Sequence, residues 1–281
     1  MSNYLFYIIY FAWLVLAPLA ISAQPQGGGQ WVAVAELTDE FDGLSLDSSK
    51  WDSYHPHWQG RPPSKFIPDN TVVKDGYLQL RASVLQNPST VANPSQDLWV
   101  GAAACVSKGW SAKPGYYYEA RIKASDLSMT SSFWFRVGQY SEIDVLEHIG
   151  HASNDRSKTL GKDLSYQYHS NTFYYGSHQG LKLKNAESPL KERGREVFHV
   201  FGFWWKDAET LLFYLDGKLV HEIAPRVPFA ENLKMIFDTE VFAEYSGEFG
   251  MPGLPRVENL TDSTKNTMYV DYVRTYKMIK K

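Results

Sequence analysis

Hydrophobic and polar residues alternate with a period of two through much of the chain after residue 30. Residues 77–81 (YLQLR) show this pattern after the turn Asp75-Gly76, and residues 116–123 (YYYEARIK) show it after Lys113-Pro114-Gly115. Such alternation is typical of strands that have one buried face. Further apolar runs predict strands over residues 198–205, 211–215, 234–237 and 268–276.

Turn-forming residues separate these strands. The segment Leu215-Asp216-Gly217-Lys218-Leu219 predicts a tight hairpin, because Asp-Gly accepts the positive φ angles of a type I′ turn. Helical periodicity is weak throughout, and neither a second linker nor a repeat interrupts the strands between Leu37 and Tyr276. The pattern therefore predicts one all-β domain over residues 31–281, folded as an antiparallel β-sandwich.

The beginning of the chain differs from this pattern. Residues 4–23 are almost wholly apolar, and the first charged residue is Glu36. The run is long enough to span a bilayer, but Pro18 and the small residues Ser22 and Ala23 are typical of a signal cleavage region. We therefore predict a signal peptide over residues 1–23 and a linker over residues 24–30. An uncleaved anchor is the alternative, because the basic segment of an ordinary signal is missing.

Composition excludes several classes of protein. The chain has 28 Lys and Arg against 31 Asp and Glu, with 44% hydrophobic and 21% charged residues, which excludes disordered, collagen-like and polytopic membrane chains. A net charge of −3 gives no support for nucleic-acid binding.

The single cysteine, Cys105, rules out an intrachain disulfide, and its apolar neighbours predict a small buried side chain. We expect a secreted or extracellular monomer, at the cell surface or in the periplasm if retained, with no stable membrane contact after signal removal.

Aromatic residues are frequent. The 9 Trp, 18 Tyr and 15 Phe residues make up 15% of the chain. So many rings either build an aromatic core or line a groove that stacks flat-faced ligands such as sugars.

Three acidic residues lie close together in residues 141–148 (SEIDVLEH). The apolar residues between them favour a strand, which in regular geometry places Glu142 and Asp144 on one face and Glu147 on the other. A β-bulge at Val145-Leu146 would bring all three carboxylates to one face. Crowded like charges are destabilising, and they persist mainly where function needs one carboxyl group kept protonated. Two carboxyl groups about 5 Å apart perform retaining glycoside hydrolysis, although a solvated strand can show the same string by chance.

The segment Glu142-Ile-Asp-Val-Leu-Glu147 resembles the bulged active-site motif of glycoside hydrolase family 16, the β-jelly-roll endo-glycanases. Residues 39–42, 75–78, 116–121, 198–205, 215–217 and 269–276 resemble other strands of that family, so the resemblance covers nearly the whole chain after the linker. It implies a jelly roll with a substrate groove on its concave face. It also implies that Glu142 is the nucleophile, Glu147 the acid/base and Asp144 an assisting residue.

Residues 51–63 (WDSYHPHWQGRPP) and 131–136 (SSFWFR) are similar to the family branch that acts on red-algal galactans. The resemblance implies a retaining endo-hydrolase of β-1,4 linkages, with agarose as the expected substrate and porphyran or κ-carrageenan as alternatives. The near-neutral charge disfavours a highly sulfated polyanion, whereas Arg61 and Arg136 could each bind one sulfate group. A non-catalytic carbohydrate-binding jelly roll is the alternative from another class, although such a module has no need of three crowded acids.

Seven residues are candidates for binding the polysaccharide: Trp58, Arg61, Trp134, Arg136, His169, Asn171 and Glu240. Trp58 and Trp134 are the preferred stacking residues, because indole faces suit the apolar faces of pyranoses. His169, Asn171 and the tyrosine pair that follows them could bond a sugar or form the polar face of a strand. Glu240 follows a strand of buried type and could reach the groove.

Metal binding has weaker support. His55 and His57 could form a metal pair, but the proline between them and the lack of a third ligand favour a loop that lines the groove. We expect catalysis to need no cofactor. The family resemblance implies a structural calcium ion opposite the groove, held by Asp271 with backbone oxygens near Gly76 and near Asp39-Glu40. Asp271 could instead pair with Arg274.

Overall fold

A computed structural model describes residue 25 and residues 29–109, 111–136, 138, 140–154, 162–175, 181–244 and 249–280. The predicted signal peptide, residues 1–23, lies outside these residues, as does most of the predicted linker. Within the described part of the chain, none of the helices is both long and apolar enough to span a bilayer.

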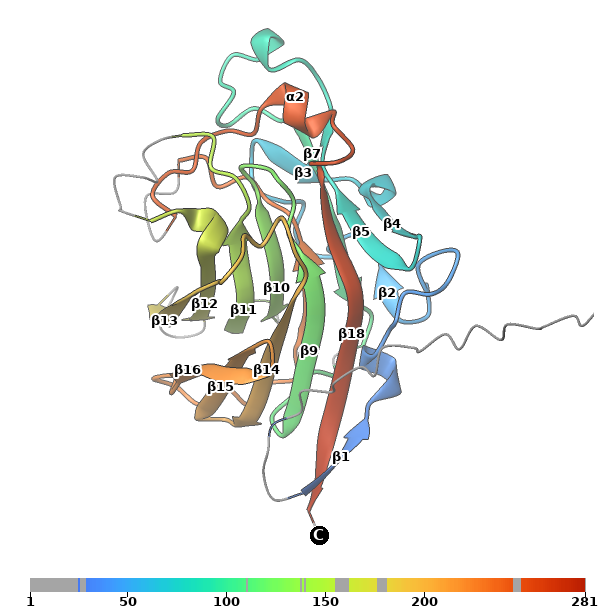
Figure 1. The fold of residues 1–281 in the computed structure, drawn as a ribbon, viewed down its shortest axis with the longest axis vertical. Coiled ribbons are helices and arrows are strands. Elements are labelled where there is room, and N and C mark those ends of the chain that lie inside the picture. The colour runs from blue at the N-terminus through green and yellow to red at the C-terminus, as the bar shows by residue number, and fades with distance from the viewer. Residues whose placement is uncertain are drawn as a thin grey trace, which may run out of the picture.

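Two large sheets pack against each other (Figure 1). The first, here called the β9 sheet, has the order β16-β15-β14-β9-β18-β5-β4, with β1 paired to β18. Its strands are β1 (Gly29–Ala33), β4 (Thr71–Lys74), β5 (Tyr77–Arg81), β9 (Tyr116–Lys123), β14 (His199–Asp207), β15 (Thr210–Leu215), β16 (Lys218–Ile223) and β18 (Thr267–Lys280).

The second sheet, here called the β11 sheet, has the order β13-β12-β11-β10-β17-β8-β2. Its strands are β2 (Trp51–Asp52), β8 (Ala104–Ser107), β10 (Thr130–Arg136), β11 (Ser141–Ile149), β12 (Gln167–Tyr174), β13 (Leu181–Pro189) and β17 (Lys234–Asp238). A small third sheet contains β3 (Ser64–Phe66), β6 (Ser83–Val84) and β7 (Val100–Ala102). Helical turns are confined to η1 (Ala35–Leu37), η2 (Pro68–Asn70), η3 (Pro88–Thr90), η4 (Leu164–Tyr166) and α2 (Val257–Leu260) among the described residues. The predicted all-β antiparallel sandwich is confirmed.

The strands predicted from alternation agree with the structure. Residues 77–81 and 116–123 are β5 and β9, and Asp216 and Gly217 have φ angles of 48° and 78°, as the type I′ hairpin requires. Strand β18 continues to Lys280, beyond the predicted end at residue 276, because β1 pairs with its last residues. Gly29 and Gln30, which we placed in the linker, therefore already belong to a strand.

Aromatic side chains fill the space between the two sheets. Phe133 and Phe135 of β10 are fully buried, and the Phe133 ring stacks on Phe237 of β17 with centroids 4.8 Å apart. Because alternate residues of a strand point to opposite faces, Ser132, Trp134 and Arg136 point away from this core. Much of the aromatic content thus builds the core, and β10 presents its polar and indole side chains on the outer face.

Candidate active site

A β-bulge in β11 places the three acids of the motif on one face of the sheet. Asp144 pairs with Asn171 of β12, and Glu147 pairs with His169, so three steps along β11 match two steps along β12. The pairing with β10 shifts at the same point and leaves Val145 as the extra residue. One extra residue returns Glu147 to the face of Asp144, as the sequence predicted.

The acids line a cleft of about 100 Å³ on the outer face of the β11 sheet. Its walls are Trp58, Arg61, Ser132, Trp134, Arg136, Glu142, Asp144, Glu147, Tyr175, Asp238, Glu240 and Phe242. The structure therefore gathers the three predicted catalytic residues and five of the seven predicted binding residues around one space.

Both carboxylate oxygens of Glu142 are held. Arg136 Nη1 donates to Oε2 at 2.8 Å, and the Tyr175 hydroxyl donates to Oε1 at 3.2 Å. The Arg136 guanidinium also lies 4.2 Å from the centre of the Tyr175 ring. Burial raises the pKa of Glu142 to about 7, while the Arg136 charge and the two hydrogen bonds oppose that rise. These two contacts fix the orientation of the Glu142 carboxylate.

Asp144 lies between the two glutamates along β11. Its side chain is buried, and its Oδ2 has no hydrogen-bond partner among the described residues. Burial, followed by the negative charges of Glu142 and Glu147, raises the pKa of Asp144 well above its usual value. A protonated Asp144 can donate a hydrogen bond to a carboxylate beside it.

Glu147 is the most open of the three acids. It is half-buried, and its Oε2 lies 3.4 Å from Nδ1 of the buried His169. The His169 ring packs edge-on against Phe249, with centroids 5.4 Å apart. A small second hollow that includes Glu147, His169, Lys162 and Glu187 continues the groove towards β13. His169 therefore contacts the predicted acid/base residue and lies in this hollow rather than in the main cleft.

Two further acids, from β17 and the residues after it, complete the cleft. Trp134 Nε1 donates to Asp238 Oδ2 at 3.1 Å, and Arg61 Nε lies 4.0 Å from Glu240 Oε2. Burial raises the pKa of Asp238 to about 7 and that of Glu240 well above its usual value. Glu240 reaches the groove as predicted. Sequence reasoning missed Asp238, although an acid at the end of an otherwise apolar strand was an available signal.

Aromatic rings line the same cleft as the acids. Trp58 is partly exposed, and the Arg61 guanidinium lies 6.0 Å from its ring and 4.3 Å from the Phe242 ring. Trp134 has only 6% of its surface exposed, so the structure makes it a wall of the cleft more than an open platform. Trp58 is the better stacking surface for a sugar.

The groove extends beyond Trp134 into a larger pocket of about 370 Å³. It is lined by His55, His57, Trp58, Trp134, Arg136, Gly138, Lys234 and Ile236. The His55 ring stacks on Trp134 at 6.2 Å with an angle of 14°. The two histidines thus line the groove, which is the interpretation that the sequence favoured over a metal pair.

Asn171 does not lie where we predicted. It is buried beside Asp144, its Oδ1 accepts a hydrogen bond from the Thr172 amide at 2.9 Å, and it lines neither the cleft nor the two hollows beside it. Because Asn171 pairs directly with Asp144, its side chain lies on the same face of the β11 sheet, but it is buried there and does not reach the surface of the cleft.

The side chains suggested for calcium binding have other partners in this structure. Asp271 Oδ2 accepts from Arg121 Nη1 at 2.7 Å, and Arg274 pairs with Glu40 at 2.8 Å, so the alternative pairing of Asp271 with Arg274 is also wrong. The carboxylate of Asp39 accepts two hydrogen bonds from neighbouring groups. Within the described ranges, no three His, Cys, Asp or Glu side chains gather closely enough to hold a metal ion.

Comparisons with known proteins match nearly all of the chain. Residues 31–278 match the family model described as "Beta-porphyranase A-D, GH16 domain". β-Porphyranase E of Zobellia galactanivorans is 36% identical over 90% of this chain and 90% of its own length. A β-agarase of Phocaeicola plebeius is 29% identical over 86% of this chain and 82% of its own. The crystal structure of a β-porphyranase from the gut bacterium Bacteroides plebeius is similar with a TM-score of 0.76 and 31% identity, covering 92% of this chain and 97% of that one.

Proposed function

We propose that this chain, which belongs to glycoside hydrolase family 16 and to its β-porphyranase A–D group, is a secreted retaining endo-hydrolase of porphyran. This is the alternative substrate of the sequence analysis, and the comparisons favour it over agarose, the expected one. The observation that carries the proposal is the pair of arginines, Arg61 and Arg136, on the walls of a cleft that contains the three acids.

Both arginines are open to a ligand. The Arg61 side chain has 44% of its surface exposed and that of Arg136 has 26%, although each already lies near a carboxylate of the cleft. Guanidinium groups bind tetrahedral oxyanions through paired, charge-assisted hydrogen bonds, so each can bind a sulfate group. Because Arg136 borders both the cleft and the larger pocket, a sulfated sugar in either space would lie within its reach.

The geometry supports a double displacement. In the first step, Glu142 attacks the anomeric carbon and forms a glycosyl ester, while the bond from that carbon to the leaving oxygen breaks and Glu147 gives its proton to that oxygen. Arg136 and Tyr175 orient the attacking carboxylate. In the second step, a water molecule attacks the same carbon, Glu147 takes the proton of that water, and the ester bond to Glu142 breaks. Two inversions leave a product with the β configuration.

Asp144 and Asp238 affect the charge of the cleft during these steps. Both are buried carboxyl groups with raised pKa values, so each stays protonated more readily than an exposed acid. A neutral Asp144 can donate to Glu142 as negative charge develops on the Glu142 carboxylate during cleavage of the ester in the second step. The same cleft without chemistry would bind sugars, but it would gain nothing from burying so many acids together.

The test is release of reducing ends from porphyran, agarose, κ-carrageenan and laminarin in parallel, with Glu142→Gln as the inactive control. We expect porphyran to be cleaved fastest, with the β-anomer appearing first in proton NMR of early products. Faster cleavage of agarose would make the protein a β-agarase and overturn the proposed specificity. Binding without cleavage of any polysaccharide would favour the carbohydrate-binding module, and an initial α-anomer would contradict the mechanism.

A further inference from the structure

A row of titratable side chains leads away from the acid/base residue across three neighbouring strands. Glu147 of β11 pairs directly with His169 of β12, and His169 pairs directly with Glu187 of β13. Directly paired residues lie on the same face of a sheet, with their side chains about 5 Å apart. The three side chains therefore stand in line on the groove face, and His169 lies between two carboxyl groups.

Lys162 closes the outer end of this row, where its ammonium group forms an ion pair with Glu187 Oε2. The Lys162 side chain has 38% of its surface exposed and that of Glu187 has 26%, whereas that of His169 has 3%. His169 Nδ1 lies 3.4 Å from Glu147 Oε2. The charge balance of a pair near the surface therefore acts on a buried ring that contacts Glu147.

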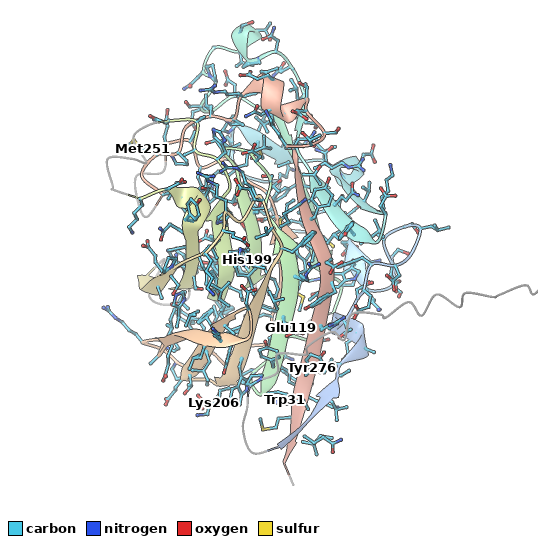
Figure 2. All side chains as sticks on the ribbon, viewed as in Figure 1. Trp31, Glu119, His199, Lys206, Met251 and Tyr276 are labelled. Carbon is cyan, nitrogen blue, oxygen red and sulfur yellow. The ribbon has the colours of Figure 1, made fainter. Side chains whose placement is uncertain are left out.

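The hollow that these residues share is too small for a sugar ring. Its volume is about 10 Å³, which is room for about one water molecule. Leu164 and Phe249 line it and belong to one buried apolar cluster. Figure 2 shows Met251, two residues after Phe249, above the strands β12 and β13 of Figure 1. The ion pair can thus act on the site through its charge without holding a sugar in this hollow.

The imidazole of His169 can compete with Glu147 for the proton that the first step needs. Transfer of that proton from Glu147 to neutral His169 leaves a carboxylate and an imidazolium, with the total charge unchanged, and this form cannot protonate the leaving oxygen. Glu187 is one strand from His169 and two strands from Glu147, so an unopposed negative charge on Glu187 favours the imidazolium. Lys162 opposes that charge.

Other charged and titratable groups surround the row. Those of the main cleft lie on the Glu147 side: Arg61, Arg136, Glu142, Asp144, Asp238 and Glu240. Negative charge on these acids favours a proton on Glu147, the nearer of the two sites. On the opposite face of β13, His221 of β16 lies 2.7 Å from the Ser188 hydroxyl, and a positive charge there would disfavour the imidazolium. Lys162 is the cation that contacts Glu187 directly.

We infer that Lys162 is a positioning residue that keeps the catalytic proton on Glu147, because it neutralises Glu187 and so leaves His169 uncharged. The inference rests on the proposed role of Glu147 as the acid. Lys162 acts through Glu187 and His169, so its effect is confined to the step that needs an acid.

The first variant, Lys162→Gln, leaves the charge of Glu187 unopposed. A negative charge about 5 Å from His169 and about 10 Å from Glu147 shifts the proton about tenfold towards the imidazole at an effective dielectric constant of about 20. The kcat on porphyran should therefore fall by up to about tenfold, with KM unchanged. Lys265→Gln is the matched control, because Lys265 is 39% exposed and pairs with Asp262 outside the cleft and its hollows. It should leave kcat unchanged.

Further variants follow the route of the effect. The double variant Lys162→Gln/Glu187→Gln has no charge left to oppose and should regain most of the lost kcat. His169→Gln removes the competing base, so adding Lys162→Gln to it should cause no further loss. On an aryl glycoside with a good leaving group the first step needs no acid, so Lys162→Gln should form the glycosyl ester as fast as the wild type.

Several results would overturn the inference. A raised KM with unchanged kcat would show that Lys162 binds the polysaccharide, and an equal loss of kcat in the His169→Gln background would show that its effect bypasses the imidazole. A lower melting temperature with unchanged kcat would leave a purely structural ion pair. If Glu147→Ala keeps full activity, the proposed mechanism itself fails. If Glu147→Ala is inactive while Lys162→Gln matches the wild type, only this inference fails.

Discussion

Arg136 and Glu142 are directly paired residues of β10 and β11, and the Arg136 guanidinium holds Glu142 Oε2 at 2.8 Å. The contact joins the residue expected to bind sulfate to the residue expected to attack the sugar. A buried carboxylate without such a cation would stay protonated and could not act as a nucleophile. Under the proposed function, the same pairing would serve both substrate binding and catalysis.

The pairing makes a prediction about pH. The positive charge of Arg136 lowers the pKa of Glu142, which burial raises to about 7, so Arg136→Gln should raise that pKa further. Because the nucleophile must be ionised, the acidic limb of the kcat/KM profile should move to higher pH, and Arg136→Lys should move it back in part. An acidic limb that stays in place in both variants would show that the guanidinium does not control ionisation of Glu142.

The role of Glu147 can be separated from that of Glu142. Glu147→Ala should reduce porphyran cleavage more than about a hundredfold, because the leaving oxygen then receives no proton. On an aryl glycoside with a good leaving group, the first step needs no acid, and added azide should restore turnover and give a β-glycosyl azide. The matched variant Glu142→Gln should not respond to azide in this way. Equal behaviour of the two variants would contradict the assigned roles.

The two tryptophans of the cleft should respond differently. Trp58 is partly exposed, so Trp58→Ala should raise KM about fivefold through loss of one stacking contact, with little change in stability. Trp134 is almost fully buried and bonded to Asp238, so Trp134→Ala should lower the free energy of unfolding by about 3–5 kcal/mol. Steady-state kinetics and chemical denaturation measure the two effects. A stable Trp134→Ala protein with raised KM would reverse this assignment.

The buried acids make the fold sensitive to pH. Burial raises the pKa of Asp238 to about 7 in the folded state, so between about pH 4 and pH 7 the folded protein binds more protons than the unfolded one. Stability should therefore fall as pH rises through this range. Asp238→Asn keeps an oxygen that can accept from Trp134 Nε1, and it should flatten the slope of melting temperature against pH. An unchanged slope would mean that other groups set the dependence.

The sequence determined the strands and the acids because both depend on neighbouring residues. Alternation of side chains is a local property of an extended backbone, so β5 and β9 could be located from their residues. The bulge at Val145 was also predictable, since only one extra residue places Glu142, Asp144 and Glu147 on one face. The Asp216-Gly217 turn follows from the φ angles that those two residues accept.

Tertiary structure decided which distant residues share the cleft. Tyr175 and Asp238 lie far from the motif in sequence, yet strand pairing brings one to Glu142 and the other to Trp134. The side chain of Asn171 is buried beside Asp144, and Trp134 is buried too deeply to be an open platform. Strand order and burial arise from the packing of segments remote in the chain, and no local pattern encodes them. The sequence could therefore name the reacting acids, while only the fold could show what surrounds them.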